Sequence, residues 1–216
     1  MKGDGEMKRI IKNTEPATFT SWKASHPGAT YKNDLCNIND ASALVVKASL
    51  KQSLLAEQKF LCCYCECRIT DANSHIEHFR PKDPTMFPNL QLEYSNLFAS
   101  CTKEPTGTID EHCGHKKGNF FSSDLVSPLE PDCSNHFSYM MDGTISGTDQ
   151  RGQVTVQKLH LDSALLNGQR KSVIDDFLDV DDELLDEEIA THLDEKGATL
   201  GEFFTMVEYL RRSGQL

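Results

Sequence analysis

The chain has 216 residues, of which 38% are hydrophobic and 25% are charged, and its mean hydropathy is -0.47. This length suits one domain with extensions and allows a true hydrophobic core. No apolar run approaches the roughly 20 residues that a membrane-spanning helix needs, and the first residues lack the apolar stretch of a signal peptide. These features exclude an integral membrane protein and lead us to expect a cytoplasmic one.

The charge of the chain is acidic but uneven. The formal net charge of -11 disfavours nucleic acid as a partner, because phosphate contacts favour a basic surface. Most of the excess lies in residues 174–195, IDDFLDVDDELLDEEIATHLDE, and the middle of the chain is close to balanced. Such a run is typical of a solvated helix face, and the alternative is a docking surface for a basic partner. The overall charge therefore leaves a nucleic-acid function open.

Residues 41–60, ASALVVKASLKQSLLAEQKF, carry strong helix formers and an apolar repeat that predicts a helix. Asn39 or Asp40 would cap its first turn. We expect this helix to support the segment that follows it. The residues expected on its buried face are Leu44, Ala48, Leu54, Leu55 and Phe60.

The C-terminal third predicts a short strand followed by helices. The strand is expected over residues 153–159, QVTVQKL, and an amphipathic helix over residues 164–180, ALLNGQRKSVIDDFLDV. A last helix is expected in GEFFTMVEYLRRS, with Phe203, Val207 and Leu210 on one stripe.

Eight cysteines in a chain without a secretion signal favour metal binding over disulfides. Cys62 and Cys65 form a Cys-x-x-Cys pair, whose spacing lets both thiolates reach one tetrahedral ion. Cys65 and Cys67 are a competing pair with a poorer spacing. We expect Cys63 and Cys67 to serve as small buried side chains.

Cys101 and Cys113 would complete a four-cysteine zinc site, in which His112 is a rival ligand because His can replace Cys. The segment between them, TKEPTGTIDEH, predicts an exposed loop because Pro, Gly, Thr and Asp dominate it. Residues 61–147 as a whole are poor in long periodic runs. This texture is typical of a small domain held by metal instead of by a large core.

The segment SHIEHFRPK places two histidines and a glutamate within four residues. In a strand, His75 and Glu77 would share one face and His78 would lie on the other. An acidic residue directly before a histidine, inside a cysteine frame, indicates a functional pair. Asn96 lies between apolar residues in LEYSNLFASC, where it would either cap a helix or hold a loop through backbone hydrogen bonds.

The order of these elements resembles the HNH endonuclease motif, a ββα-metal fold with a treble-clef zinc frame. LCCYCECRI, HIEHFRPK, YSNLFASC, CGHKKGN and VSPLEPDCSNHFSYMMDGTISG are similar to the PtuB-type HNH proteins of Septu and related retron antiphage systems. The resemblance covers residues 54–147 well and continues more weakly through VTVQKLHLDSALLNGQRKSV. It implies an α+β fold. We expect an N-terminal segment with its support helix (1–60), the HNH core (61–147) and a helical acidic region (148–216).

The resemblance also implies a nuclease that hydrolyses phosphodiester bonds in DNA or RNA. His78 would be the base that activates water, since an imidazole titrates near neutral pH. Glu77 would bind one Mg²⁺ or Mn²⁺ through oxygen, and Asn96 would brace the loop that aims His78. The cysteines would hold a structural zinc ion. The residues expected to contact nucleic acid are Arg80, Lys82, Lys116 and Lys117.

Three features depart from the commonest HNH form. Glu77 stands where Asp is usual, so the catalytic metal would lie one methylene further out. Eleven residues separate the last two cysteines of the frame, where the simplest motif has two. Gly114 stands where His or Asn usually follows the last cysteine. His115 and Asn119 are therefore rivals for the second ligand of the catalytic metal.

The partners that the resemblance implies are an ATPase of the PtuA type, and a retron reverse transcriptase with its DNA. The acidic C-terminal helices are candidates for docking the ATPase, and no membrane partner is expected. The alternative function is a catalytically silent zinc module that binds nucleic acid or protein. The Glu77–His78 pair with Asn96 favours the nuclease, because a scaffold would not require it.

Overall fold

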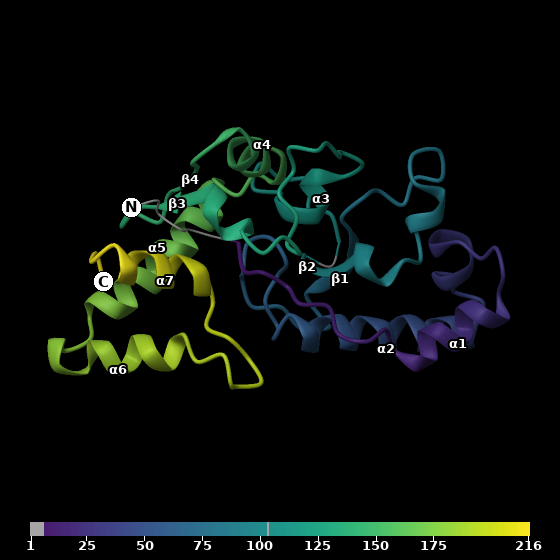
Figure 1. Cartoon of the computed structure of the whole chain (residues 1–216), viewed down its shortest axis with the longest axis horizontal. Helices are drawn as coiled ribbons and strands as arrows, with labels where there is room; N and C mark the ends of the chain where they lie inside the picture. The colour runs from purple at the N-terminus through teal and green to yellow at the C-terminus, as the bar shows by residue number, and fades with distance from the viewer. Residues whose placement is uncertain (1–6, 103) are drawn as a thin grey trace.

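A computed structural model describes residues 7–102 and 104–216. Helices and strands are mixed along the chain, which confirms the expected α+β class (Figure 1). The elements are α1 (Ala17–Ser25), α2 (Ala41–Glu57), β1 (Ser74–His78), β2 (Leu97–Cys101), α3 (Cys113–Lys117), β3 (Phe137–Tyr139), β4 (Ile145–Gly147), α4 (Gln150–Leu159), α5 (Ala164–Leu178), α6 (Asp182–His192) and α7 (Phe204–Arg212). Short π or 3-10 turns lie at Tyr31–Leu35, Pro88–Leu90, Tyr94–Asn96 and Cys133–His136.

The strands form two antiparallel pairs, β1 with β2 and β3 with β4. In the first pair Glu77 lies opposite Phe98 and His78 opposite Leu97. Helices α2 and α3 both contact β2. The hairpin is therefore held by packing against both helices, and its first strand is the SHIEH segment.

Helix α2 begins after Asp40, whose side chain accepts hydrogen bonds from the N–H groups of Ser42 and Ala43. Of the two candidate caps, Asp40 is thus the one used. The expected burial of Leu44 and Ala48 is wrong, because both are exposed. Phe60 lies beyond the helix, in a left-handed turn, and is half-buried. The buried residues of α2 are Ala43, Leu50, Leu54 and Leu55.

The strand expected at 153–159 is wrong, because these residues belong to helix α4. Asp149 caps this helix by accepting a hydrogen bond from Gly152 N at 2.8 Å. The spacing of the buried positions is helical, and tertiary packing of this face outweighs the β-propensity of Val and Thr. The buried residues of α4 are Gly152, Thr155, Val156 and Leu159.

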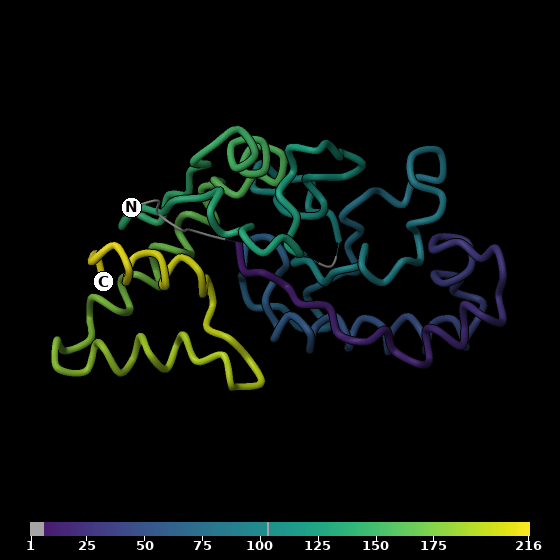
Figure 2. Tube along the Cα trace, viewed as in Figure 1, coloured from purple at the N-terminus to yellow at the C-terminus, as the bar shows by residue number. Residues whose placement is uncertain are grey.

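Gln58 joins the end of α2 to β2. Its Nε2 donates to the carbonyls of Leu61 and Ala99, both at 2.8 Å, and its Oε1 accepts from Ala99 N at 2.7 Å. The N-terminal segment runs along the same region (Figure 2), where Lys12 Nζ lies 2.5 Å from a Glu57 carboxylate oxygen. These contacts fix β2, and with it Cys101, relative to the support helix.

Helices α5, α6 and α7 gather at one end of the molecule (Figure 1). The predicted stripe of Phe203, Val207 and Leu210 is buried, which confirms it. In α6, Ile189 is the buried residue and the acidic side chains are exposed, as expected of a solvated helix face. Within the described ranges, every helix is too short or too polar to cross a bilayer.

Candidate metal centre and catalytic site

The four sulfur atoms of Cys62, Cys65, Cys101 and Cys113 lie within 4.8 Å of one another, and all four residues are buried. Cys65 Sγ and Cys101 Sγ are 3.7 Å apart. A tetrahedral ion with zinc–sulfur bonds of about 2.3 Å would separate its ligands by roughly 3.8 Å. The expected set of four ligands is thus brought together with the spacing of a zinc site.

Local backbone geometry creates this cluster. Residues 62–67 form a tight turn in which Cys62 N donates to Cys67 O at 3.0 Å and Glu66 adopts a left-handed conformation. Cys101 ends β2, and its N–H donates to Cys62 Sγ at 3.3 Å. Cys113 begins α3. In the predicted loop between Cys101 and Cys113, residues 104–109 are exposed, as expected, and the two cysteines at its ends both belong to the cluster.

The electrostatics of the cluster favour a cation. Burial raises the pKa of the Cys62 thiol, but hydrogen bonds from Cys101 and Cys113 outweigh burial and hold this pKa well below its ordinary value. Burial likewise raises the pKa of Cys65, and hydrogen bonds with Cys101 and Cys113 outweigh it, so that this pKa is also lowered. Thiolates in so buried a cluster would need a compensating positive charge, which a bound metal ion supplies.

The other cysteines of this segment lie outside the cluster. Cys63 is buried, and its N–H donates to Ala99 O at 3.1 Å. Cys67 is half-buried, and its sulfur donates to Gln169 Oε1 at 3.4 Å. The competing pair of Cys65 and Cys67 is therefore not the one brought together. His112 borders the cluster as the residue before α3, with Nδ1 2.7 Å from Asp110 O.

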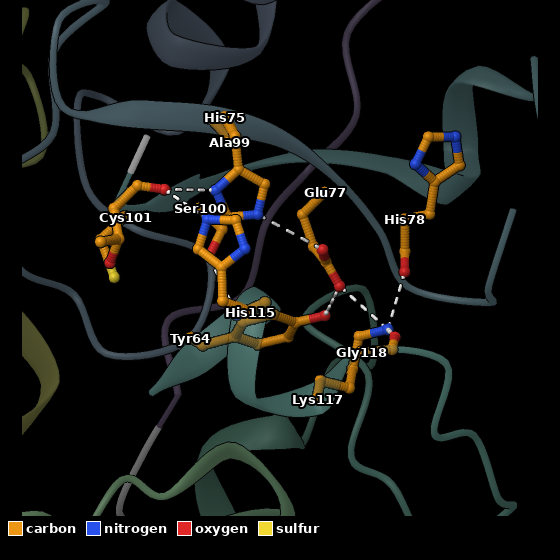
Figure 3. Close-up of polar contacts among 12 residues, drawn as sticks. Tyr64, His75, Glu77, His78, Ala99, Ser100, Cys101, His115, Lys117 and Gly118 are labelled. Atoms are coloured by element: carbon orange, nitrogen blue, oxygen red, sulfur yellow. Dashed lines mark hydrogen bonds and ion pairs between the residues drawn. The ribbon is translucent and has the colours of Figure 1, made fainter. Parts of the chain in front are cut away.

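Glu77 is buried in β1 and its carboxylate faces three side chains (Figure 3). Oε1 accepts from Tyr64 Oη at 3.2 Å and lies 3.0 Å from Lys117 Nζ, and Oε2 lies 3.5 Å from His75 Nε2. Burial alone would raise the pKa of Glu77, but His75 and Lys117 lower it to about 2. The carboxylate is therefore ionised, and Oε1 is committed to protein donors.

His78 is buried beside Glu77, and its ring diverges from the carboxylate, as alternation in a strand requires (Figure 3). The ring packs edge-on against Tyr31, 4.4 Å between centroids, and its Nε2 lies 2.9 Å from Gln91 O. A carbonyl only accepts, so Nε2 carries the proton and Nδ1 has a free electron pair. Burial is the main cause that lowers the pKa of His78 to about 4. The imidazole of His78 is thus neutral at pH 7.

Asn96 is buried and holds the loop that follows His78. Its Oδ1 accepts from Arg80 N at 2.8 Å, and its Nδ2 donates to the carbonyls of Arg80 and Leu90 at 2.9 and 3.0 Å. Leu90 precedes the residue whose carbonyl orients the His78 ring. Of the two roles that the sequence left open, the side chain holds a loop.

The two rivals for a metal ligand near Glu77 lie at different places. His115 is half-buried, its Nε2 donates to Thr102 O at 2.9 Å, and its ring stacks on His75 with centroids 4.2 Å apart. Asn119 is exposed. A cavity of about 170 Å³ is lined by His75, Ile76, Glu77, His78, Pro81, Lys82, Gly114, His115, Gly118 and Asn119. The structure therefore adds His75 to the candidate metal ligands near Glu77. In the sequence, the only signal for it is the alternation of a strand, which puts His75 and Glu77 on one face.

The four basic residues expected at nucleic acid divide into two classes. Arg80, Lys82 and Lys116 are exposed. Arg80 lies over the ring of Phe121 at 5.3 Å. Lys117 differs, because its side chain is 1% exposed and its ammonium pairs with Glu77 and donates to His78 O at 3.0 Å. Its charge is therefore directed into the site instead of outward.

Comparison with known proteins gives relatives for part of the chain. The chain is 34% identical over 119 residues to the Septu protein PtuB of Bacillus thuringiensis, an alignment that covers 53% of this chain and 42% of that protein. It is similar to PtuB-type HNH proteins. This confirms the resemblance expected from the motifs.

Two retron proteins extend the same result. The chain is 33% identical over 138 residues to "Retron Vc95 putative HNH endonuclease" of Vibrio cholerae serotype O1 biovar El Tor, covering 60% of this chain and 65% of that protein. It is 35% identical over 156 residues to "Retron Ec83 putative HNH endonuclease" of Escherichia coli, covering 62% and 58%. No family model matches the chain. The chain thus spans 42% to 65% of the length of these relatives.

Proposed function

We propose that this chain is a metal-dependent HNH endonuclease that hydrolyses phosphodiester bonds in DNA or RNA. The observation that carries the proposal is the placement of an ionised Glu77 and a neutral His78 at the end of β1, beside the four-cysteine cluster. The names of the relatives, which include HNH endonuclease, support the same activity.

The fold supports this proposal through the order β1, β2, α3 around the cysteines. Cys62 and Cys65 precede the hairpin, Cys101 ends it and Cys113 begins the helix. This arrangement agrees with a ββα-metal core in which zinc has a structural role, since all four ligands are protein thiolates and no position is left for substrate.

In the proposed mechanism His78 is the general base. Its Nε2–H is held by the Gln91 carbonyl, so the free Nδ1 accepts a proton from the attacking water. Asn96 fixes both sides of the loop that carries this carbonyl. The depressed pKa of His78 keeps the imidazole unprotonated, and therefore able to act, at neutral pH.

Glu77 fits the role of a ligand for Mg²⁺ or Mn²⁺. The carboxylate is ionised, Lys117 and Tyr64 fix its Oε1, and Glu77 lines the 170 Å³ cavity. Hard divalent cations prefer such oxygen ligands. When bound, the ion would neutralise charge that develops on the phosphate and the leaving oxygen.

The exposed basic residues Arg80, Lys82 and Lys116 are the proposed phosphate contacts. Lys82 lines the cavity itself, and Arg80 also lines a neighbouring cavity of about 360 Å³ together with Asn96 and Phe121. Lys116 is exposed on α3, next to His115, which lines the first cavity. These cations offer phosphate contacts on a chain that is acidic overall.

We further propose that the chain is the effector nuclease of an antiphage system and acts with an ATPase of the PtuA type. The support is the similarity to a Septu protein and to retron proteins. Helix α6 offers a docking face, because its acidic residues are exposed. These are Asp182, Glu183, Asp186, Glu187 and Glu188. Control by a partner would also explain how a chain with a net charge of -11 engages nucleic acid.

The test is a cleavage assay on plasmid DNA and on RNA, with Mg²⁺ or Mn²⁺, using the purified chain with and without an ATPase of the PtuA type. We expect His78→Ala to reduce cleavage by about 10²–10⁴-fold, the contribution of a positioned general base. His26→Ala, which changes an exposed histidine, serves as the matched control and is expected to cut like the wild type.

Equal cleavage by the wild type and His78→Ala would remove His78 as the base. Zinc-loaded protein that cleaves neither substrate in any combination, but still binds nucleic acid or the ATPase, would favour the alternative of a catalytically silent zinc module.

A further inference from the structure

We infer that His75 is the second protein ligand of the divalent cation at Glu77. In the common HNH motif this ligand is the residue after the last cysteine, where this chain has Gly114. This inference rests on the proposed function for the existence of the cation. It concerns which side chains of the chain hold that cation.

The carboxylate of Glu77 has one oxygen engaged and one directed at His75. Oε1 is held by Tyr64 and Lys117, whereas Oε2 lies 3.5 Å from His75 Nε2. His75 and Glu77 project from the same face of β1, two positions apart. A gap of this size suits two ligand atoms of one ion, each bound at about 2.0–2.2 Å.

The other nitrogen of His75 shows which atom is available. Nδ1 lies 2.7 Å from the carbonyl of Thr102, which only accepts, so Nδ1 carries the proton. Nε2 is therefore the ring nitrogen placed to bind an ion, and it faces Oε2 of Glu77 at 3.5 Å. A metal-binding histidine characteristically donates its other N–H to a carbonyl in this way.

The space around Gly114 explains why the ligand comes from β1. A Cβ at residue 114 would lie 2.7 Å from Oε2 of Glu77 and 2.7 Å from Nε2 of His75. A side chain in this position would collide with the pair, so glycine here and histidine at 75 form one arrangement. The ligand position is thus filled from the strand instead of from α3.

The two rivals from α3 and its end are less suited to the ion. His115 donates its Nε2 to the same Thr102 carbonyl and stacks on His75, so it orients the His75 ring. Asn119 is exposed. We therefore place His115 as a positioning residue and leave Asn119 outside the set of ligands.

The experiment measures Mn²⁺ binding to the zinc-loaded full chain by electron paramagnetic resonance and by calorimetry, without substrate. We expect His75→Ala to weaken binding at least tenfold, the usual size of a lost contact at a metal site. Asn119→Ala is the matched control at the cavity rim and is expected to bind within twofold of the wild type. Zinc content and circular dichroism show that each variant is folded.

A transplanted ligand separates coordination from folding. In the double variant His75→Ala/Gly114→His the collision with His75 is removed, and only the end of the Glu77 side chain has to shift to admit the new residue. We expect part of the lost Mn²⁺ affinity to return. Wild-type affinity in folded His75→Ala, or loss of affinity in Asn119→Ala alone, would overturn the inference. If His75→Ala does not fold, the inference is then decided by His75→Gln, for which unchanged affinity overturns it and a loss supports it.

The outcome is distinct from that of the proposed function. Mn²⁺ binding that depends on His75 without any cleavage would support this site and contradict the nuclease. Cleavage together with Mn²⁺ binding that does not depend on His75 would support the nuclease and contradict this site.

Discussion

Asn96 and Arg80 exchange two hydrogen bonds, from Arg80 N to Oδ1 at 2.8 Å and from Nδ2 to Arg80 O at 2.9 Å. This pairing closes the loop of residues 81–95 onto the start of β2, directly after the candidate base. The buried amide of Asn96 thus fixes the backbone of Arg80, two residues after His78.

Replacing this amide should loosen the loop. Asn96→Ala leaves three backbone groups of Arg80 and Leu90 without their partner, and an unmade buried hydrogen bond costs about 1–3 kcal/mol. We expect the free energy of unfolding in urea to fall by that order, and cleavage to fall further because His78 loses its support. Asn96→Asp keeps the acceptor and loses both donor bonds. A variant with unchanged stability and unchanged cleavage would show that the loop does not depend on Asn96.

The cysteine cluster predicts a sharp difference between two nearby substitutions. Cys113→Ser removes one of the four ligands, whereas Cys67→Ser changes a half-buried thiol outside the cluster. We expect the first variant to lose zinc and melt at a much lower temperature, because metal binding and folding are coupled in such sites. The second should keep one zinc per chain. Metal analysis and thermal denaturation measure both, and equal zinc content in the two variants would argue against the assigned ligands.

Adjacent lysines provide another contrast. Lys117 pairs with Glu77 in the interior, whereas Lys116 is exposed. Lys117→Met leaves a buried carboxylate without its partner, which is expected to cost about 3–5 kcal/mol of unfolding free energy. It should also raise the pKa of Glu77, since Lys117 helps to hold that pKa low.

Lys116→Met should change stability by less than about 0.5 kcal/mol and weaken nucleic-acid binding instead. Chemical unfolding and filter binding distinguish the two roles. The assignment fails if Lys116→Met destabilises the protein as much as Lys117→Met does.

A pH dependence of stability is expected at His192. Burial lowers the pKa of His192 in the folded chain, where its Nε2 donates to Glu202 O at 2.9 Å and its ring meets Phe177. The unfolded chain, with a histidine pKa of about 6.5, then binds more protons below that pH than the folded chain does. Stability is therefore full above pH 6.5 and decreases as the pH falls from there.

The variant His192→Gln does not titrate and should have a flatter pH profile. Urea unfolding at pH 5, 6 and 7 measures the difference from the wild type. The variant His26→Gln, at an exposed position, is the control for replacing a histidine by glutamine. Parallel profiles for the wild type and His192→Gln would contradict the expected burial of this ring.

Local sequence determined the parts of the protein that depend on short spacings. The Cys-x-x-Cys turn, the shared face of His75 and Glu77, and a cap of α2 at Asn39 or Asp40 follow from backbone geometry over a few residues. The α+β class and the resemblance to PtuB-type proteins were likewise available from the sequence, because they rest on the order of motifs.

Tertiary structure decided what depends on distant neighbours. Residues 153–159 become helical because one face of α4 packs against the core, which local propensity cannot register. Lys117 turns inward because β1 brings Glu77 to it across 40 positions of sequence. Gly114 is small because His75 and Glu77 already fill the space where its side chain would lie. Only the folded chain brings His75, Glu77 and Gly114 together, and the candidate metal site exists only where they meet.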